Sequence, residues 1–172
     1  MVVEVSVEEA LNNMPLPLVI ISAESKSGKR VGMTAAWVTQ ISWKPPLIGV
    51  AIYHKWTTLR AILERGEFAI HYVSPRLVNA AIEIFGGMSS AKVDKFEVAS
   101  QKYGLQVEKG KAIEAPILVD APYIVECKLA GYYEIGDHYL VVCNPIVAYK
   151  GCEETPLVFY KGKACSVKID DS

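Results

Sequence analysis

The pattern of hydrophobic and polar positions predicts a chain built mostly from short strands. Runs of apolar, β-branched and aromatic residues bounded by turn residues are typical of strands. Such runs lie at 15–24, 30–43, 47–53, 67–73, 113–119, 123–133, 138–149, 156–160 and near 163–169. The sequence SKSGK at 25–29 indicates a turn, and Pro45 and Pro46 exclude a central strand at that point. Residues 123–149 predict a long hairpin that turns at EIGDH.

Four segments have the features of short helices. Ser6 and Glu9 form a capping box at the start of a helix that ends near Asn13. In the second segment, 57–66, Leu59, Ile62 and Leu63 share one face. The other two expected helices span 74–85, where Pro75 takes the first helical position, and 94–104. GGMSSAKV, between the last two, predicts a mobile loop.

Strands therefore outnumber helices, and most neighbouring strands are expected to run antiparallel. Helices that are few and irregularly placed argue against a doubly wound parallel sheet. The pattern favours a mainly β (α+β) fold: a closed or nearly closed antiparallel barrel with short helical insertions. No repeat or linker divides the 172 residues, so we expect a single domain over 1–172.

Composition narrows the partners and the compartment. With 51% hydrophobic and 22% charged residues, the chain is expected to be globular. A net charge of −1 argues against a nucleic-acid surface but leaves room for a local basic pocket. MVVEVSVEEALNN has no secretory pattern, and no apolar run reaches the roughly 18 residues of a membrane span. We therefore expect no membrane contact and a cytoplasmic location.

The four cysteines, Cys127, Cys143, Cys152 and Cys165, form no CxxC pair. Free thiols in a reducing cytoplasm are the expected state. Cys127 and Cys143 lie on the two arms of the long hairpin and could face each other. Both interpretations, two small core residues and an isolated disulfide, stay open at this point.

The usual catalytic and metal-binding motifs are missing from the sequence. His54, His71 and His138 are far apart and have no ligand spacing, so no metal site is expected. Neither a GxSxG elbow nor a P-loop is present, and the GG at 86–87 lacks the flanking pattern of a dinucleotide fold. The sequence therefore suggests either a non-catalytic domain or one whose cofactor carries the reaction, with no catalytic side chain.

Two stretches suit a flat, phosphorylated cofactor. The first, GMTAAWVTQISWKPPLIGVAI at 32–52, has small residues that allow a planar ligand to approach the backbone. The second, YHKWTTLR at 53–60, places Lys55, Thr57 and Thr58 at a helix start, which suits a phosphate. Ordinary explanations also exist: a half-buried strand, a helix cap, and a hairpin turn at Gly-Asp-His. The order and spacing of these three signals in one chain, the two stretches and the Gly-Asp-His turn, favour a bound ligand over the ordinary explanations.

Taken together, residues 14–165 resemble the flavin reductase-like, FMN-binding split-barrel family. The 32–52 stretch is similar to that family's Gly-x-Thr-Ala-Ser run with its double proline, and HKWTTLRAI followed by GEFAIHYV to its flavin-phosphate segment. KVDKFE is similar to its Lys-Phe pair, and GDHYLVVCNPIV to the turn of its NAD(P)H-using members. Ala36 stands where many members have Ser, His71 and Tyr72 replace an Asn and an aliphatic residue, and Trp37 and Trp56 add bulk.

The resemblance implies a six-stranded split barrel, a homodimer, and FMN near the subunit interface. By this resemblance, the flavin ring would be lined by Thr34, Ala35, Ala36 and Trp37, and Thr39 and Gln40 would lie beside the ring or the ribityl chain. The resemblance assigns the ribityl chain and phosphate to Ala51, Ile52, Lys55 and Thr57, and makes Lys95 a second-layer cation. It places Gly136, Asp137 and His138 at the nicotinamide.

Three functions follow as hypotheses. The first is an NAD(P)H-dependent reductase whose flavin passes electrons to free flavin, a ferric chelate or a partner protein. The second is a flavoredoxin-like FMN electron carrier that does not use NAD(P)H directly. The third is a flavin-free barrel that binds another ligand or a protein.

Overall fold

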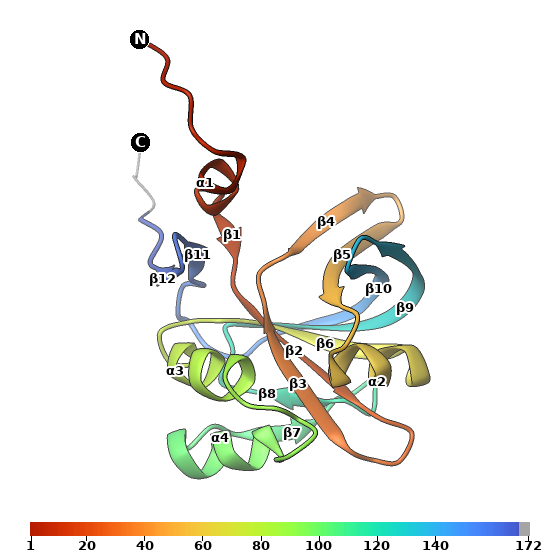
Figure 1. The fold of residues 1–172 in the computed structure, drawn as a ribbon. Helices are drawn as coiled ribbons and strands as arrows, with labels where there is room; N and C mark the ends of the chain where they lie inside the picture. The colour runs from red at the N-terminus through yellow and green to blue at the C-terminus, as the bar shows by residue number, and fades with distance from the viewer. Residues whose placement is uncertain (169–172) are drawn as a thin grey trace.

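A computed structural model describes residues 1–168 and shows one large antiparallel sheet with short helices around it (Figure 1). The sheet has seven strands in the order β3-β2-β6-β9-β10-β5-β4. Its strands are β2 (Val19–Glu24), β3 (Arg30–Ala35), β4 (Val38–Trp43), β5 (Pro46–Tyr53), β6 (Glu67–Tyr72), β9 (Tyr123–Ile135) and β10 (His138–Lys150). The predicted mainly antiparallel β fold with short helical insertions is confirmed.

Smaller elements surround this sheet. A three-stranded sheet joins β1 (Leu16–Pro17), β11 (Val158–Tyr160) and β12 (Lys163–Cys165), and a two-stranded one joins β7 (Val107–Lys109) and β8 (Pro116–Leu118). The helices are α1 (Val7–Asn12), α2 (Thr57–Arg65), α3 (Val78–Ala80), the π-helix η1 (Ala81–Gly86) and α4 (Lys95–Tyr103). None of the helices within residues 1–168 is both long and apolar enough to cross a membrane.

The connection between β3 and β4 shows that the large sheet is curled. These two strands form its opposite edges, yet only Ala36 and Trp37 separate them in the chain. Two residues span at most about 11 Å from one strand end to the next, so the edges must meet there. The link also bonds to the neighbouring ladder, because the Trp37 carbonyl accepts from the Ala51 N–H at 2.9 Å.

Two hydrophobic clusters pack on the sheet. The first lies under η1 and α4 and includes Phe85 and Phe96, whose rings meet edge to face at 5.1 Å. The second lies inside the curled sheet and under α2, where Ile52, Ile62 and Phe68 are fully buried. Successive side chains of β2 and β6 pack into one cluster and then the other, because neighbouring residues of a strand point to opposite faces of the sheet.

Several sequence-based boundaries were wrong in informative ways. The expected strands 15–24 and 30–43 are each interrupted, at Leu18 and at Ala36 and Trp37, where the chain changes sheet or edge. The expected helix over 74–85 begins only at Val78, and its second half is π-helical. Pro46 is the first residue of β5 and pairs with Trp43 of β4; the pairing of β5 with β10 ends at Ile48, so the missing N–H of Pro46 leaves no bond to β10 unmade. Strand β7 was missed, and the last expected strand ends at Cys165, with residue 169 outside the described part.

The hairpin of β9 and β10 was predicted correctly. Ile135 pairs with His138, so Gly136 and Asp137 form a two-residue turn, and Gly136 has a φ of +61°. Cys127 and Cys143 lie on this hairpin as buried free thiols, but they are not directly opposite: Cys127 pairs with Pro145 and Cys143 with Leu129. The contact with the Cys143 side chain, together with burial, raises the pKa of the Cys127 thiol, which fits the core interpretation.

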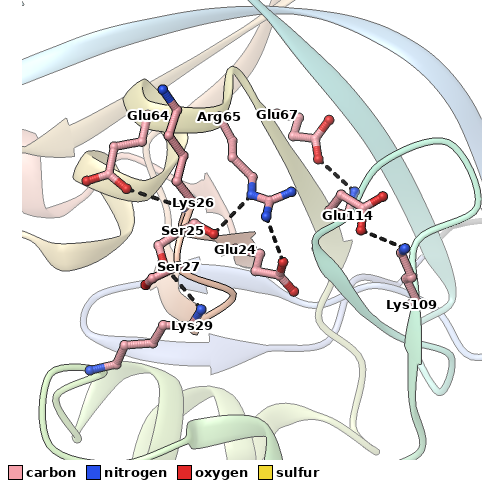
Figure 2. A network of polar contacts seen from close by, with 10 residues as sticks. All are labelled: Glu24, Ser25, Lys26, Ser27, Lys29, Glu64, Arg65, Glu67, Lys109 and Glu114. Atoms are coloured by element: carbon pink, nitrogen blue, oxygen red, sulfur yellow. Dashed lines mark hydrogen bonds and ion pairs between the residues drawn. The ribbon is translucent and has the colours of Figure 1, made fainter.

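A polar network anchors helix α2 to the turn between β2 and β3 (Figure 2). Arg65, in the last turn of α2, pairs with Glu24 at 3.1 Å and donates to the Ser25 carbonyl at 3.0 Å. A cation at this end also suits the helix dipole. The C-terminal half of α2 is therefore fixed, and this positions its N-terminal turn at the pocket described next.

Candidate functional site

The N-terminal turn of α2 opens into a pocket of about 400 Å³, here called the phosphate pocket after the group that the sequence analysis expects at this turn. It is lined by Gly32, Tyr53, Lys55, Trp56, Thr57, Thr58, Gly86, Gly87, Met88, Ser89, Ser90 and Lys95. The structure thus brings together three predicted residues, Lys55, Thr57 and Lys95, with Lys95 coming from a distant part of the chain. Two lysines and two threonine hydroxyls give it the composition of an anion site.

The first turn of α2 offers backbone donors to this pocket. Trp56 is the N-cap and makes no side-chain cap hydrogen bond. Within the described chain, the N–H groups of Thr57 and Thr58 have no backbone acceptor. Aligned peptide dipoles make such a terminus favourable for a negative charge.

Lys95 adds a buried cation. Its side chain is 2% exposed, and its ammonium donates to the carbonyls of Gly32 at 2.9 Å and Phe85 at 2.7 Å. It has no carboxylate partner among residues 1–168, and burial lowers its pKa to about 8. A buried ammonium is costly without an opposite charge, so an anionic ligand in this pocket would stabilise it.

The loop after η1 forms the facing wall. Ser90 is buried, and its hydroxyl both donates to the Gly32 carbonyl and accepts from the Gly32 N–H, each at 3.2 Å. Lys95 bonds the same Gly32 carbonyl, so β3, the loop and α4 meet at one residue. A side chain at Gly32 would collide with Phe85 at 2.9 Å, which explains the glycine there.

An aromatic cluster lies beside the phosphate pocket and connects it to the Gly136–Asp137 turn. Tyr53 lines the pocket, and its ring centroid is 5.6 Å from that of His138, which lies 4.7 Å from the indole of Trp37. His138 Nδ1 is 2.6 Å from the Asp137 carboxylate, and this bond lowers the pKa of Asp137. The Asp137 carbonyl also bonds His54 Nδ1 at 2.9 Å. The predicted nicotinamide residues therefore neighbour the predicted flavin residues.

The predicted ring-binding segment lies between these two regions. Thr34 is half-buried at the end of β3, and its hydroxyl donates to the Ala81 carbonyl of η1. Ala35 is buried, whereas Ala36 and Trp37 lie between the strands. Within the described residues, the N–H groups of Ala36 and Trp37 donate to no other backbone group. They are free to bond the polar edge of a flat ligand.

Besides the residues of the segment 34–37, four predicted residues of β4 and β5 also lie outside the phosphate pocket. Thr39 and Gln40 lie on β4 and line a separate apolar groove with Leu18, Leu47 and other residues. Ile52 is fully buried in the core, so only its backbone could contact a ligand. Ala51 is half-exposed beside Trp37, and its N–H is already bonded.

The sequence did not identify the wall built by residues 86–90, with Gly32 opposite. Gly86, Gly87, Ser89 and Ser90 were interpreted only as a mobile loop, although small polar residues beside a Lys-Phe pair are a signal for close approach to a phosphate. Tyr53 was also missed. Its position beside the pocket depends on the pairing of β5 with β10, where Tyr53 lies opposite His138. Among the described residues, no group of three or more His, Cys, Asp or Glu could hold a metal ion.

Comparison with known families gives a match over most of the chain. The model for the flavin reductase like domain matches residues 11–168. The chain is 27% identical over 140 residues to a ferric-chelate reductase (NAD(P)H) of Archaeoglobus fulgidus, covering 81% of this chain and 79% of that protein. It spans between 48% and 63% of the length of the first three curated relatives that it matches.

Solved structures show the same fold. A NADH:FAD oxidoreductase of Streptomyces globisporus superposes with a TM-score of 0.84 at 20% identity, over 98% of this chain and 99% of that one. Flavoredoxin from Methanosarcina acetivorans superposes with a TM-score of 0.81 at 22% identity, over 100% and 93%. At these identities the likeness establishes the fold alone, whereas the family match covers most of the chain. The chain belongs to the flavin reductase like domain family.

Proposed function

We propose that this chain is an FMN-binding, NAD(P)H-dependent reductase that passes electrons to free flavin or a ferric chelate. The observation that carries the proposal is the phosphate pocket, where uncapped α2 N–H groups, Lys55, Thr57 and the buried ammonium of Lys95 converge. When bound, FMN would supply the redox chemistry by taking up a hydride from nicotinamide and passing electrons on.

The residues present fit the cofactor at both ends. The α2 N–H groups, Lys55 and Thr57 would hold the phosphate, and Lys95 would neutralise part of its charge. Ala36 and Trp37 would offer N–H groups to the polar edge of the ring system. The α2 network and the Gly32 contacts fix much of this site before binding, so little ordering would be required.

The Gly136–Asp137 turn would orient the nicotinamide. A carboxylate can only accept, so His138 Nδ1 donates in its 2.6 Å bond with Asp137, and in the tautomer with a single proton on Nδ1 the Nε2 atom would be an acceptor. A carboxamide N–H of the nicotinamide could donate to it. No protein base is required, because hydride transfer needs position more than proton movement.

The flavoredoxin-like electron carrier remains the second candidate because of Trp37. Its residue is 55% exposed and its indole lies 4.7 Å from the His138 ring at a tilt of 46°, so it would cover the surface that a nicotinamide would use. A chain in which Trp37 stays there would receive electrons from a redox partner. Anaerobic NADH addition to the FMN-loaded protein separates the two: bleaching supports the reductase, and an unchanged spectrum supports the carrier.

We further propose that two copies assemble as a homodimer. The groove that contains Thr39 and Gln40 has a volume of about 630 Å³ and an almost entirely apolar lining. The N-terminal segment is equally unpartnered: α1 has no buried residue, and Val3, Val7 and Leu11 are more than half exposed. Apolar surface of this extent is typical of an interface. Thr39 and Gln40 would then lie at the junction of two chains.

The phosphate assignment is tested with Thr57→Val, which removes one hydroxyl and keeps the shape. FMN affinity is expected to fall by about fivefold to tenfold, because one hydrogen bond to a charged group is lost. Riboflavin, which has no phosphate, should bind the variant and the parent protein equally. An equal loss for both ligands would show that Thr57 does not contact the phosphate, and no FMN binding by the parent protein would refute the proposed function.

A further inference from the structure

His54 is an exposed histidine that the proposed function leaves without a role. It follows the end of β5 at Tyr53 and comes directly before Lys55 and the start of α2. Its backbone N–H donates to the Asp137 carbonyl at 3.2 Å, and its ring nitrogen Nδ1 lies 2.9 Å from the same oxygen. A carbonyl oxygen can only accept, so Nδ1 carries a proton and donates. Two donors of one residue therefore hold a single oxygen of the β9–β10 turn.

Closing this turn does not require the bond from the imidazole. Ile135 and His138 already pair across the two-residue turn, and Gly136 takes the positive φ that such a turn needs. The backbone N–H of His54 holds the Asp137 carbonyl in addition. Both residues of the side-chain bond are exposed, where a single hydrogen bond adds little to stability. The stability of the turn therefore does not explain the imidazole.

The carbonyl that His54 holds belongs to the peptide unit that leads into His138. The Asp137 carbon and oxygen and the His138 nitrogen and Cα lie in one plane, because the peptide bond has partial double-bond character. Fixing the Asp137 oxygen therefore fixes the direction in which His138 leaves the turn. The Asp137 carboxylate accepts from His138 Nδ1 at 2.6 Å, which fixes the imidazole of His138 as well. Backbone and ring of His138 are thus both held through Asp137.

His54 also connects the turn to the phosphate pocket. Tyr53 lines that pocket, and its ring centroid lies 4.5 Å from that of His54 and 5.6 Å from that of His138. The Tyr53 carbonyl accepts from the Trp56 N–H at 3.1 Å, which makes a tight turn from the end of β5 into α2. His54 lies inside this tight turn. Its two bonds to Asp137 therefore tie the N-terminus of α2 to the β9–β10 turn.

We propose that His54 is a positioning residue for the reductase: its imidazole holds the β9–β10 turn so that His138 faces a nicotinamide while the flavin phosphate lies at α2. The proposal rests on the reductase function proposed above and adds a residue that does not line the phosphate pocket. Hydride transfer depends steeply on the relative position of the two reactants. A loosened turn would therefore impair the use of NADH without weakening FMN binding.

Two substitutions separate the bond from the ring. His54→Phe keeps a ring beside Tyr53 but has no donor. In His54→Asn the amide nitrogen is two bonds from Cβ, as Nδ1 is in histidine, so it can donate to the same oxygen. Both variants change an exposed side chain, so both are expected to fold.

The first measurement is the anaerobic bleaching of FMN-loaded protein by NADH, followed by stopped flow. His54→Phe should need about threefold to tenfold more NADH for the half-maximal rate, because one hydrogen bond is lost, with unchanged FMN affinity. His54→Asn should behave like the parent protein. Dithionite needs no nicotinamide site and should bleach all the proteins equally fast. Gln101→Ala, which removes an exposed side-chain bond to Glu97 on α4, is the matched control.

A second measurement needs neither flavin nor NADH. The chain has three histidines, so ¹⁵N-histidine labelling gives three backbone amide signals, of which His54→Phe retains those of His71 and His138. The order parameter of the His138 amide should fall from about 0.85 toward 0.6 in His54→Phe and stay high in His54→Asn. His71, fully buried on β6, is the internal reference.

The outcomes separate this role from the reductase function itself. A His138 amide that stays rigid in His54→Phe, or an NADH dependence equal to that of the parent protein, would overturn the role of His54 alone. Equal impairment of both variants would assign the effect to the ring, and a lower FMN affinity would place His54 in the flavin site; each result also overturns it. A parent protein that binds FMN but is not bleached by NADH would instead refute the reductase function.

Discussion

At the scale of single residues, the buried ammonium of Lys95 distinguishes a binding site from ordinary packing. A lysine that is 2% exposed and bonded only to two carbonyls reduces the stability of the free protein. Its pKa, about 8 in the folded state, lies below the ordinary 10.5. The unfolded chain therefore holds the proton more tightly, so this group lets stability rise with pH between about 8 and 10.5.

Lys95→Met is expected to weaken FMN binding by about tenfold at pH 7, because the phosphate loses a buried cation. A bound phosphate favours the charged lysine, so the affinity of the parent protein should fall as pH rises through 8. The variant should lack that fall. Titrations at pH 7 and 9 measure both effects, with Lys92→Met, in the exposed loop before α4, as the control. A pH profile unchanged in Lys95→Met would exclude Lys95 from the phosphate site.

His71 predicts a different pH dependence. It is fully buried on β6, its Nδ1 bonds the Ile20 carbonyl at 3.0 Å, and its Nε2 has no partner in the described chain. Burial lowers its pKa from 6.5 to about 4. The unfolded chain takes up the proton first on acidification, so stability is lost as pH falls from about 6.5 to 4. The loss from this one group is about 3 kcal/mol.

His71→Leu should remove that part of the acid sensitivity. Urea unfolding at pH 6.5 and 4 gives the difference in unfolding free energy for each protein, and the variant should lose about 3 kcal/mol less than the parent. Carboxylates such as Glu154, whose pKa values are lowered, contribute equally to both proteins. If both lose the same amount, His71 does not titrate differently in the folded state.

At the scale of elements, the β9–β10 turn gives a prediction about His138. Gly136 has a φ of +61°, and no atom lies within 4 Å of the position that a Cβ would take there, so only backbone strain opposes alanine. Gly136→Ala is expected to cost about 1 kcal/mol of stability. It should also raise the KM for NADH severalfold by moving His138, the neighbour of that turn.

Gly162→Ala is the matched control for this prediction. Gly162 has a φ of +75° and equally open surroundings, but it lies in the β11–β12 turn. The Gly162→Ala variant should lose about as much unfolding free energy as Gly136→Ala, measured by denaturant unfolding, and its KM for NADH should not change. Equal KM values for both variants would show that the β9–β10 turn does not position the nicotinamide.

The elements themselves were predictable where one local signal decided them. Asp94 caps α4 through bonds to Phe96 N–H and Glu97 N–H, and Gly104 ends it with a φ of +65°. The segment 74–85 failed because tertiary bonds compete with the local pattern. The Arg76 N–H bonds the Glu154 carboxylate, and the Ala81 carbonyl accepts from Thr34. These contacts delay the helix start and accompany the π-helical turn.

At the scale of the whole molecule, the apolar groove and the exposed N-terminal segment predict the dimer. Leu47 lines the groove on β5 and is half-buried, so Leu47→Glu would place a charge in an apolar interface. Light scattering after gel filtration should give twice the chain mass for the parent protein and a smaller mass for the variant. Ile82→Glu, at an exposed site on η1, is the control. A parent protein of single-chain mass would refute the dimer.

The sequence by itself determined the local features: the strand-rich pattern, the hairpin at Gly136, the helix caps, and the Lys55–Thr57 motif before α2. Each depends on residues a few positions apart, so a linear pattern records it. Only the tertiary structure decided that Gly32, Lys55, Ser90 and Lys95 share one pocket and that Thr39 and Gln40 face another groove. It also decided that Cys127 does not lie directly opposite Cys143. These juxtapositions depend on strand order and register, which arise from burial across the whole sheet and leave no short-range trace.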